Sequence, residues 1–153
     1  MQPLKILNSK EKKEITKLLN EGYNCDFSCD FDVFRNQSNR IFLLSKDFSK
    51  INVEKLRINS LGLYLGEIYD NSIRLSIEGS QLIGKTAKKN LIEISDDDAI
   101  RWMRGEDFMV NSDLTGFVIV KNKDDFLGCG KVSQKKLFNY VPKERRMSVS
   151  QSM

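Results

Sequence analysis

The chain has 153 residues, with 25 Lys and Arg against 21 Asp and Glu, a formal net charge of +4 and no histidine. The lack of histidine excludes the Ser–His and Cys–His relays of many hydrolases and removes the commonest metal ligand. Hydrophobic residues make up 40% and charged residues 30%, as in a folded protein of one domain or two small modules.

A helix is predicted near the N-terminus. Asn8 and Glu11 have the spacing of a capping box, Ile15 and Leu19 lie on one apolar stripe, and Gly22 follows as a stop signal. From Tyr23 onward the apolar residues recur at every second position, which is the period of a strand with one buried side. The strands predicted in this half are 23–33, Ile41–Leu44, and the hairpin arms Leu61–Tyr69 and Ser72–Ile77, which flank Asp70-Asn71.

The second half contains the best-specified helix. Ser95 is its predicted N-cap, Asp96–Asp98 occupy the first turn, and Arg101 and Arg104 fall in the last turn before Gly105. Each sign of charge therefore lies at the helix end that the macrodipole favours. The predicted strands here are Leu91–Ile94, Gly116–Lys121, Phe126–Val132 and Leu137–Val141. The whole pattern is α+β, with a seam near residues 85–90.

All three cysteines are predicted to be buried in the core. Cys25 and Cys29 lie on the apolar side of the same predicted strand, and no histidine or second cysteine pair completes a tetrahedral metal site. Cys129 has no relay partner that would make it a nucleophile. We therefore expect no metal and no cofactor. Because no apolar run approaches about 20 residues, we expect no membrane span, and we expect a cytoplasmic location.

Gly79–Thr86 satisfies the phosphate-loop pattern G-x-x-x-x-G-K-[ST] letter for letter. Its context is unfavourable, because only Ala87–Asn90 separate Thr86 from the next strand, whereas a phosphate loop opens a long crossover helix. The preceding strand is also predicted to be an antiparallel hairpin arm. Nucleotide binding by Gly79–Thr86 remains an alternative.

The last part of the chain is basic, with six Lys and Arg from residue 131 onward against Glu144 alone. Such a cluster attracts polyanions; the alternative is a solvated tail. Arg101 and Arg104 share a helical face beside Gly105, where a backbone can approach a phosphate closely. Their alternative role is helix-end electrostatics. Trp102 is assigned either to the core or to base stacking.

Residues 97–131 resemble the PUA domain, a small β-barrel that binds structured RNA. Between the expected helix and the following strand, 111–116 replace the Pro-Gly that is common in that family. The positions that carry the resemblance are Ala99, Gly105, Asp107, Met109, Gly116, Val118, Val120, Leu127, Gly128 and Gly130.

The first half is similar to the domain that precedes PUA in a small large-subunit ribosome-biogenesis protein and in archaeal PUA proteins allied to Sun-family RNA cytosine-C5 methyltransferases. The resemblance implies two domains, an N-terminal pre-PUA α+β domain with an antiparallel sheet at 1–88 and a PUA-like RNA-binding β-barrel at 89–153. The positions that carry it are Pro3, Leu4, Arg40–Ser45, Ser60–Gly62, Gly66, Arg74 and Leu75.

These observations predict a non-catalytic protein that binds structured rRNA or tRNA in ribosome biogenesis or RNA modification. A methyltransferase needs a separate cofactor-binding domain, for which we expect no room. An adaptor that recruits an RNA methyltransferase or ribosome-assembly factors through protein contacts is an alternative. The predicted RNA-binding residues are Arg101, Arg104, Gly105, Lys131, Lys135, Lys136, Lys143, Arg145 and Arg146.

Overall fold

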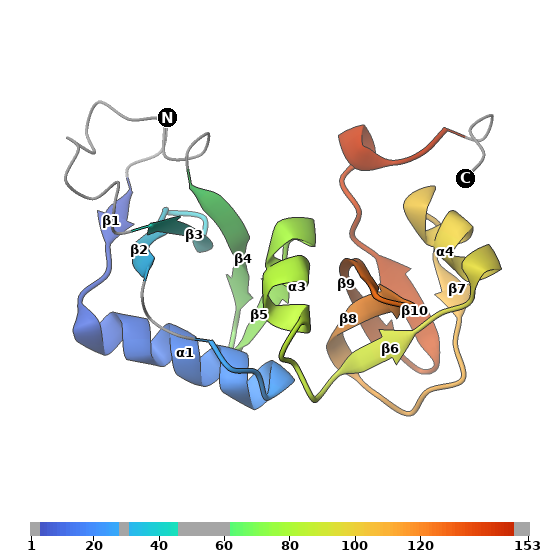
Figure 1. Cartoon of the computed structure of the whole chain (residues 1–153), viewed down its shortest axis with the longest axis horizontal. Helices are drawn as coiled ribbons and strands as arrows, with labels where there is room; N and C mark the ends of the chain where they lie inside the picture. The colour runs from blue at the N-terminus through green and yellow to red at the C-terminus, as the bar shows by residue number, and fades with distance from the viewer. Residues whose placement is uncertain (1–3, 28–30, 46–61, 149–153) are drawn as a thin grey trace.

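Two β-sheets with a helix between them make up most of the computed structural model, which describes residues 4–27, 31–45 and 62–148 (Figure 1). Sheet A is antiparallel throughout. Its strands, in spatial order, are β1 (Lys5–Ile6), β2 (Phe31–Arg35), β3 (Arg40–Ser45), β4 (Leu63–Tyr69) and β5 (Ser72–Leu75). Sheet B is curled and contains one parallel pair, β6 with β8. Its strands, in spatial order, are β6 (Leu91–Glu93), β8 (Gly116–Asn122), β9 (Asp125–Ser133), β10 (Lys136–Asn139) and β7 (Phe108–Met109).

The first helix, α1 (Ser9–Tyr23), begins where the capping box predicts. Asn8 Oδ1 accepts from the Glu11 N–H at 2.9 Å, and Glu11 Oε1 accepts from the Asn8 N–H at 3.1 Å. The helix continues past Gly22 and ends at Tyr23, because Asn24 adopts the left-handed conformation that terminates it.

The predicted strand 23–33 is wrong in its first part. Tyr23 belongs to α1 and is buried, and residues 24–27 form no regular element, so the described strand β2 begins only at Phe31. The Tyr23 hydroxyl donates to the Ile73 carbonyl at 2.7 Å, so tertiary packing of an amphipathic ring overrides the local alternation. Cys29 lies outside the described residues.

The predicted hairpin is confirmed in its turn and pairing, but its second arm ends at Leu75 and not at Ile77, which is already helical. Strands β4 and β5 pair in register from Tyr69 with Ser72, and Asp70 takes a positive φ in the turn. Of its first arm, Leu61 lies outside the described residues.

In the second half, helix α4 (Asp96–Met103) starts after Ser95, whose Oγ accepts a hydrogen bond from the Asp98 N–H at 3.1 Å. Strands β8, β9 and β10 also lie where the sequence predicts them.

Helix α3 (Ile77–Gly84) was not predicted, and it contradicts the phosphate loop. Ser76 caps it by accepting from the Gly79 N–H at 2.8 Å, so Gly79–Gly84 are helical rather than a loop of free N–H groups. A Cβ at Gly79 would overlap the Leu65 carbonyl oxygen, so this glycine serves close packing on β4. The Thr86 hydroxyl accepts from the Asp26 N–H at 2.9 Å. The expectation of one N-terminal helix is corrected accordingly.

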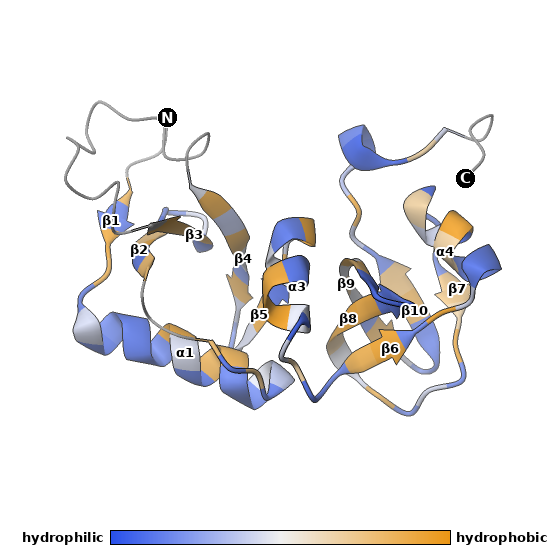
Figure 2. Cartoon of the chain, in the orientation of Figure 1, coloured by the Kyte–Doolittle hydropathy of each residue, from blue (hydrophilic) through white to orange (hydrophobic). Residues whose placement is uncertain are grey.

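Sheets A and B share a hydrophobic core. Ile119 of β8 and Cys129 of β9 pack in the same cluster as Leu19 of α1 and Leu65 of β4, with α3 lying between the sheets (Figures 1 and 2). Burial raises the pKa of the Cys129 thiol to about 11, and its Sγ lies 3.8 Å from the Tyr23 hydroxyl. The Cys129 thiol is therefore protonated at neutral pH, and its burial in a strand agrees with the sequence prediction.

A second core lies under α4. Trp102 is fully buried there with Val118, Val132 and Leu137 of sheet B, which excludes Trp102 as a platform for a base. Among the described helices, none is both long and apolar enough to span a membrane.

Candidate functional site

The C-terminal end of α4 is held by backbone and side-chain contacts to the end of β10. The Asn139 side-chain amide donates to the Trp102 carbonyl at 2.8 Å and to the Glu106 carbonyl at 3.3 Å. Asp107 Oδ1 accepts from the Asn139 N–H at 2.7 Å. The turn after α4 is therefore rigidly placed on sheet B. Sequence reasoning missed Asn139, although Asp107 was one of the positions that carried the resemblance.

Arg146 folds back onto this turn. Its Nε donates to the Val141 carbonyl at 2.9 Å, and the Met147 N–H donates to the Met103 carbonyl at 2.8 Å. Gly105 has a φ of 88°, and a Cβ there would overlap the Arg146 side chain. Residue 105 is therefore restricted to glycine both by its left-handed backbone and by the guanidinium that covers it.

We call Arg101, Arg104, Gly105 and Arg146 the α4 basic surface. Arg101 is exposed, with Nη1 3.8 Å from Asp98 Oδ1, a separation typical of a weak exposed pair. Of the nine predicted RNA-binding residues, the structure brings these four together, even though Arg146 is distant from α4 in sequence.

The three predicted lysines of β9, β10 and the turn between them lie elsewhere. Lys131 alternates along β9 with Val132, whose side chain packs in the core under α4, so Lys131 points from the opposite face of sheet B. Lys136 lies on that face too, because it pairs with Ser133, two residues beyond Lys131. Lys135 occupies the turn between the strands and contacts Asp113 Oδ1 at 3.2 Å. None of the three adds charge beside α4.

Lys143 and Arg145 belong to a short 3₁₀ helix, η3 (Lys143–Arg145). Arg145 Nη1 lies 2.6 Å from Glu78 Oε1 on α3, which ties η3 to the helix between the sheets. Arg145 and Arg146 are adjacent in sequence, yet they contact different parts of the molecule.

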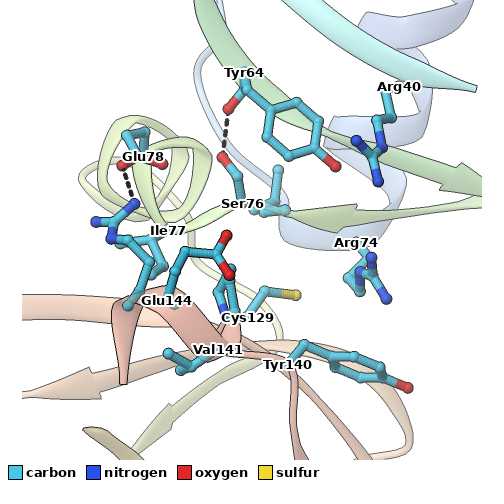
Figure 3. Close-up of a pocket in the computed structure, with 14 residues that line it drawn as sticks. Arg40, Tyr64, Arg74, Ser76, Ile77, Glu78, Cys129, Tyr140, Val141 and Glu144 are labelled. Atoms are coloured by element: carbon cyan, nitrogen blue, oxygen red, sulfur yellow. Dashed lines mark hydrogen bonds and ion pairs between the residues drawn. The ribbon is translucent and has the colours of Figure 1, made fainter. Parts of the chain in front are cut away.

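A cavity of about 390 Å³ lies between sheets A and B. Figure 3 shows Arg40, Tyr64 and Arg74 on one side and Tyr140 and Glu144 on the other. Sequence reasoning missed this cavity, because its lining comes from segments far apart in the chain. Arg40 and Arg74 were noted only as positions of the resemblance.

Glu67 neutralises part of the charge of this cavity. Its carboxylate contacts Arg74 Nη2 at 3.3 Å and Arg40 Nε at 3.7 Å. Two guanidinium groups thus share one carboxylate. Burial raises the pKa of Tyr64 above its usual value, so this phenol stays neutral and is able to donate a hydrogen bond over the physiological range.

Asp96, in the first turn of α4, has structural partners. The Asp96 carboxylate accepts hydrogen bonds from Asn122 at 3.0 Å and from Lys123 at 3.2 Å, and these bonds lower the pKa of Asp96. Within the described ranges, no group of three or more Cys, Asp or Glu side chains is arranged to hold a metal ion.

Comparison with known proteins identifies the second half. Residues 89–147 match the family model described as the methyltransferase RsmF PUA domain. This part of the chain is a PUA domain. It contains α4, sheet B, the α4 basic surface and η3. The predicted resemblance to PUA and to Sun-family methyltransferases is confirmed.

Curated relatives extend the similarity into the first half. The chain is 32% identical over 109 residues to "Ribosomal RNA small subunit methyltransferase F" of Aeromonas hydrophila, covering 71% of this chain and 23% of that protein. It is 23% identical over 142 residues to the protein of the same name from Vibrio vulnificus, covering 93% of this chain and 30% of the relative. The chain thus spans less than a third of the length of either enzyme.

Proposed function

We propose that the chain binds structured rRNA or tRNA through its PUA domain, in ribosome biogenesis or RNA modification, and acts without chemistry of its own in the cytoplasm. The family match over 89–147 carries this proposal. The relatives named as ribosomal RNA methyltransferases support an RNA substrate, and the chain corresponds to only 23–30% of their length.

The α4 basic surface is the proposed contact with the RNA backbone. Arg101 in the last turn of α4 and Arg104 at its C-cap place two guanidinium groups at this end of the helix, and Arg146, which covers Gly105, adds a third. A phosphate at this turn would meet these side chains rather than the Gly105 main chain. Phosphate contacts by arginine give binding that tolerates sequence changes and weakens with salt, while specificity comes from RNA shape. Lys143 and Arg145 of η3, which precede Arg146, are the proposed edge of this interface. Lys131 and Lys136 lie on the opposite face of sheet B and Lys135 contacts Asp113, so these three lysines are not assigned to it.

We further propose the domain division at 1–88 and 89–153. All described strands of sheet A precede Ser76, and all strands of sheet B follow Asn90, which supports a boundary in between. The N-terminal unit is then a pre-PUA domain that packs on the PUA domain through α3 and the shared core.

Recruitment of an RNA methyltransferase is the second candidate. Its support is that the relatives join a region similar to this chain to a much longer remainder. On this proposal, the chain supplies RNA binding while a separate protein supplies catalysis. A methyltransferase should co-purify with the full chain and be lost on Ile6→Asp, which changes an exposed side chain of β1 in sheet A, while RNA affinity stays unchanged.

Replacing Arg101 and Arg146 with alanine is expected to weaken binding to an rRNA hairpin on the order of tenfold at low salt, because two phosphate contacts are lost. Fluorescence anisotropy of the labelled hairpin measures this effect. The matched control is Lys17→Ala with Arg35→Ala, which removes the same charge from α1 and β2. Lys17 lies 3.8 Å from Glu21, and Arg35 Nη2 donates to Asn39 Oδ1 at 2.8 Å. Equal affinities for the two double variants would contradict the assignment of the α4 basic surface.

A further inference from the structure

Two exposed aromatic rings and one half-buried ring meet along the line where the two sheets join. The ring centroids of Tyr69 (β4) and Phe117 (β8) are 5.9 Å apart, and those of Phe117 and Tyr140 are 6.2 Å apart. Tyr69 and Tyr140 are 43% and 38% exposed. Large exposed aromatic side chains gathered in one place mark an interaction site more often than chance exposure.

Cations accompany these rings. The Arg74 guanidinium carbon lies 5.1 Å from the Tyr69 ring centroid and 4.7 Å from that of Tyr140, and Lys131 Nζ lies 6.0 Å from that of Phe117. These distances are those of cation–π contacts. We call Tyr69, Arg74, Phe117, Lys131 and Tyr140 the seam ledge. It is a surface of aromatic faces and positive charge.

The seam ledge continues into the cavity between the sheets. Arg74 and Tyr140 belong to both, and inside the cavity Arg40 lies 5.8 Å from the Tyr64 ring centroid (Figure 3). Glu67 contacts both Arg40 and Arg74, and the Glu144 carboxylate lines the facing wall. The cavity therefore combines two guanidinium groups for an anion with a carboxylate that accepts hydrogen bonds from an amino group.

A surface of aromatic faces with interleaved cations is suited to bind unpaired nucleic acid. Bases that are not paired stack on aromatic rings, and arginine and lysine hold the phosphates between them. A duplex does not offer its base faces, so the seam ledge does not suit the same RNA element as the α4 basic surface. The two surfaces are joined by η3, where Arg145 faces α3 and the next residue, Arg146, covers Gly105.

We propose that the seam ledge and the adjoining cavity bind one or two unpaired nucleotides of RNA, with a base stacked on Tyr140 and phosphates at Arg74 and Arg40. This inference rests on the proposed function, because the unpaired nucleotides would flank the structured RNA that the α4 basic surface holds. The Glu144 carboxylate then accepts a hydrogen bond from an exocyclic amino group of the base that enters the cavity.

The test compares one RNA hairpin with and without a single-stranded extension of about eight nucleotides. The extension is expected to increase the affinity of the wild-type chain. Tyr140→Ala should lower the affinity for the extended hairpin about tenfold, whereas Tyr140→Phe, which keeps the aromatic face, should retain the wild-type affinity. Ile6→Ala is the matched control, because Ile6 is an exposed apolar side chain on β1, 56% exposed and outside the seam ledge.

The outcomes separate this inference from the proposed function. If the extension adds no affinity, or if Tyr140→Ala keeps the full gain, the seam ledge does not bind unpaired nucleotides. The proposed function still stands in that case if hairpin affinity depends on Arg101 and Arg146. Arg74→Ala should lose the gain as Tyr140→Ala does, and thermal unfolding of each variant establishes that the loss is not one of folding.

Discussion

Trp102→Ala is expected to lower the free energy of unfolding by about 3–5 kcal/mol, the usual loss when a buried tryptophan is truncated. Trp102 is fully buried, and its ring fills the space above Gly130, where a Cβ would come within 2.8 Å of Cη2. Removing the indole leaves a cavity between α4 and sheet B that the rigid strands do not close. Urea denaturation followed by far-UV circular dichroism measures the loss.

Trp102→Phe is the matched variant. It keeps an aromatic ring in the same space and removes the indole N–H, which is buried without a hydrogen-bond partner among the described residues. An unsatisfied buried donor is costly, so we expect Trp102→Phe to lose less stability than Trp102→Ala. A stability for Trp102→Ala within about 0.5 kcal/mol of the wild-type value would contradict the position of Trp102 in the core.

Gly79→Ala is the second large effect. The added Cβ would overlap the Leu65 carbonyl oxygen, so α3 must move away from β4, and overpacking of this kind destabilises by about 1–3 kcal/mol or more. Because α3 lies between the two sheets, the shift also disturbs the shared core. The expected result is a lower unfolding midpoint in urea.

Gly22→Ala is the control, since it makes the same substitution in α1 where nothing lies within 4 Å of the new Cβ. There, alanine should raise stability by about 0.5–1 kcal/mol through its helix propensity. If both variants were stabilised, the close packing of α3 on β4 would be wrong. If Gly79 belonged to a phosphate loop, its replacement would abolish nucleotide binding. Because Gly79 lies in helix α3, we do not expect the chain to bind a nucleotide there.

Local signals predicted most of the elements. The capping box at Asn8 and Glu11 located the start of α1, and the charge pattern from Asp96 to Arg104 located α4. These signals work because capping and dipole interactions are made within one turn of the chain. The hairpin at Asp70 was predicted for the same reason, as its turn chemistry is local.

The elements that sequence reasoning missed depend on distant contacts. Helix α3 contains two glycines within eight residues, a composition that favours a loop, and what stabilises it is the close approach of Gly79 to β4. Tyr23 continued an alternating pattern, but its hydroxyl bonds to the Ile73 carbonyl, 50 residues away. Alternation alone does not reveal such a partner.

The residues of the candidate sites also fall into those that local sequence predicted and those that only folding brings together. Arg101, Arg104 and Gly105 were predicted together because one helix end carries them. The contact of Arg146 with Gly105 and the meeting of Arg40, Arg74 and Tyr140 around one cavity arise only when the chain has folded. The lysines of β9 and β10 were grouped with α4 by charge, yet strand alternation places Lys131 on the other face of sheet B.

The salt dependence of RNA binding by the unmodified chain tests the central claim most directly. Three arginines on phosphates predict that the logarithm of the association constant falls with the logarithm of salt concentration with a slope of roughly −2 to −3 between about 50 mM and about 200 mM. In the Arg101→Ala, Arg146→Ala variant the slope should become shallower by about 2. A structured rRNA fragment that fails to bind at the lowest salt, or binds with an affinity that salt does not change, would contradict an RNA-binding role for this PUA domain.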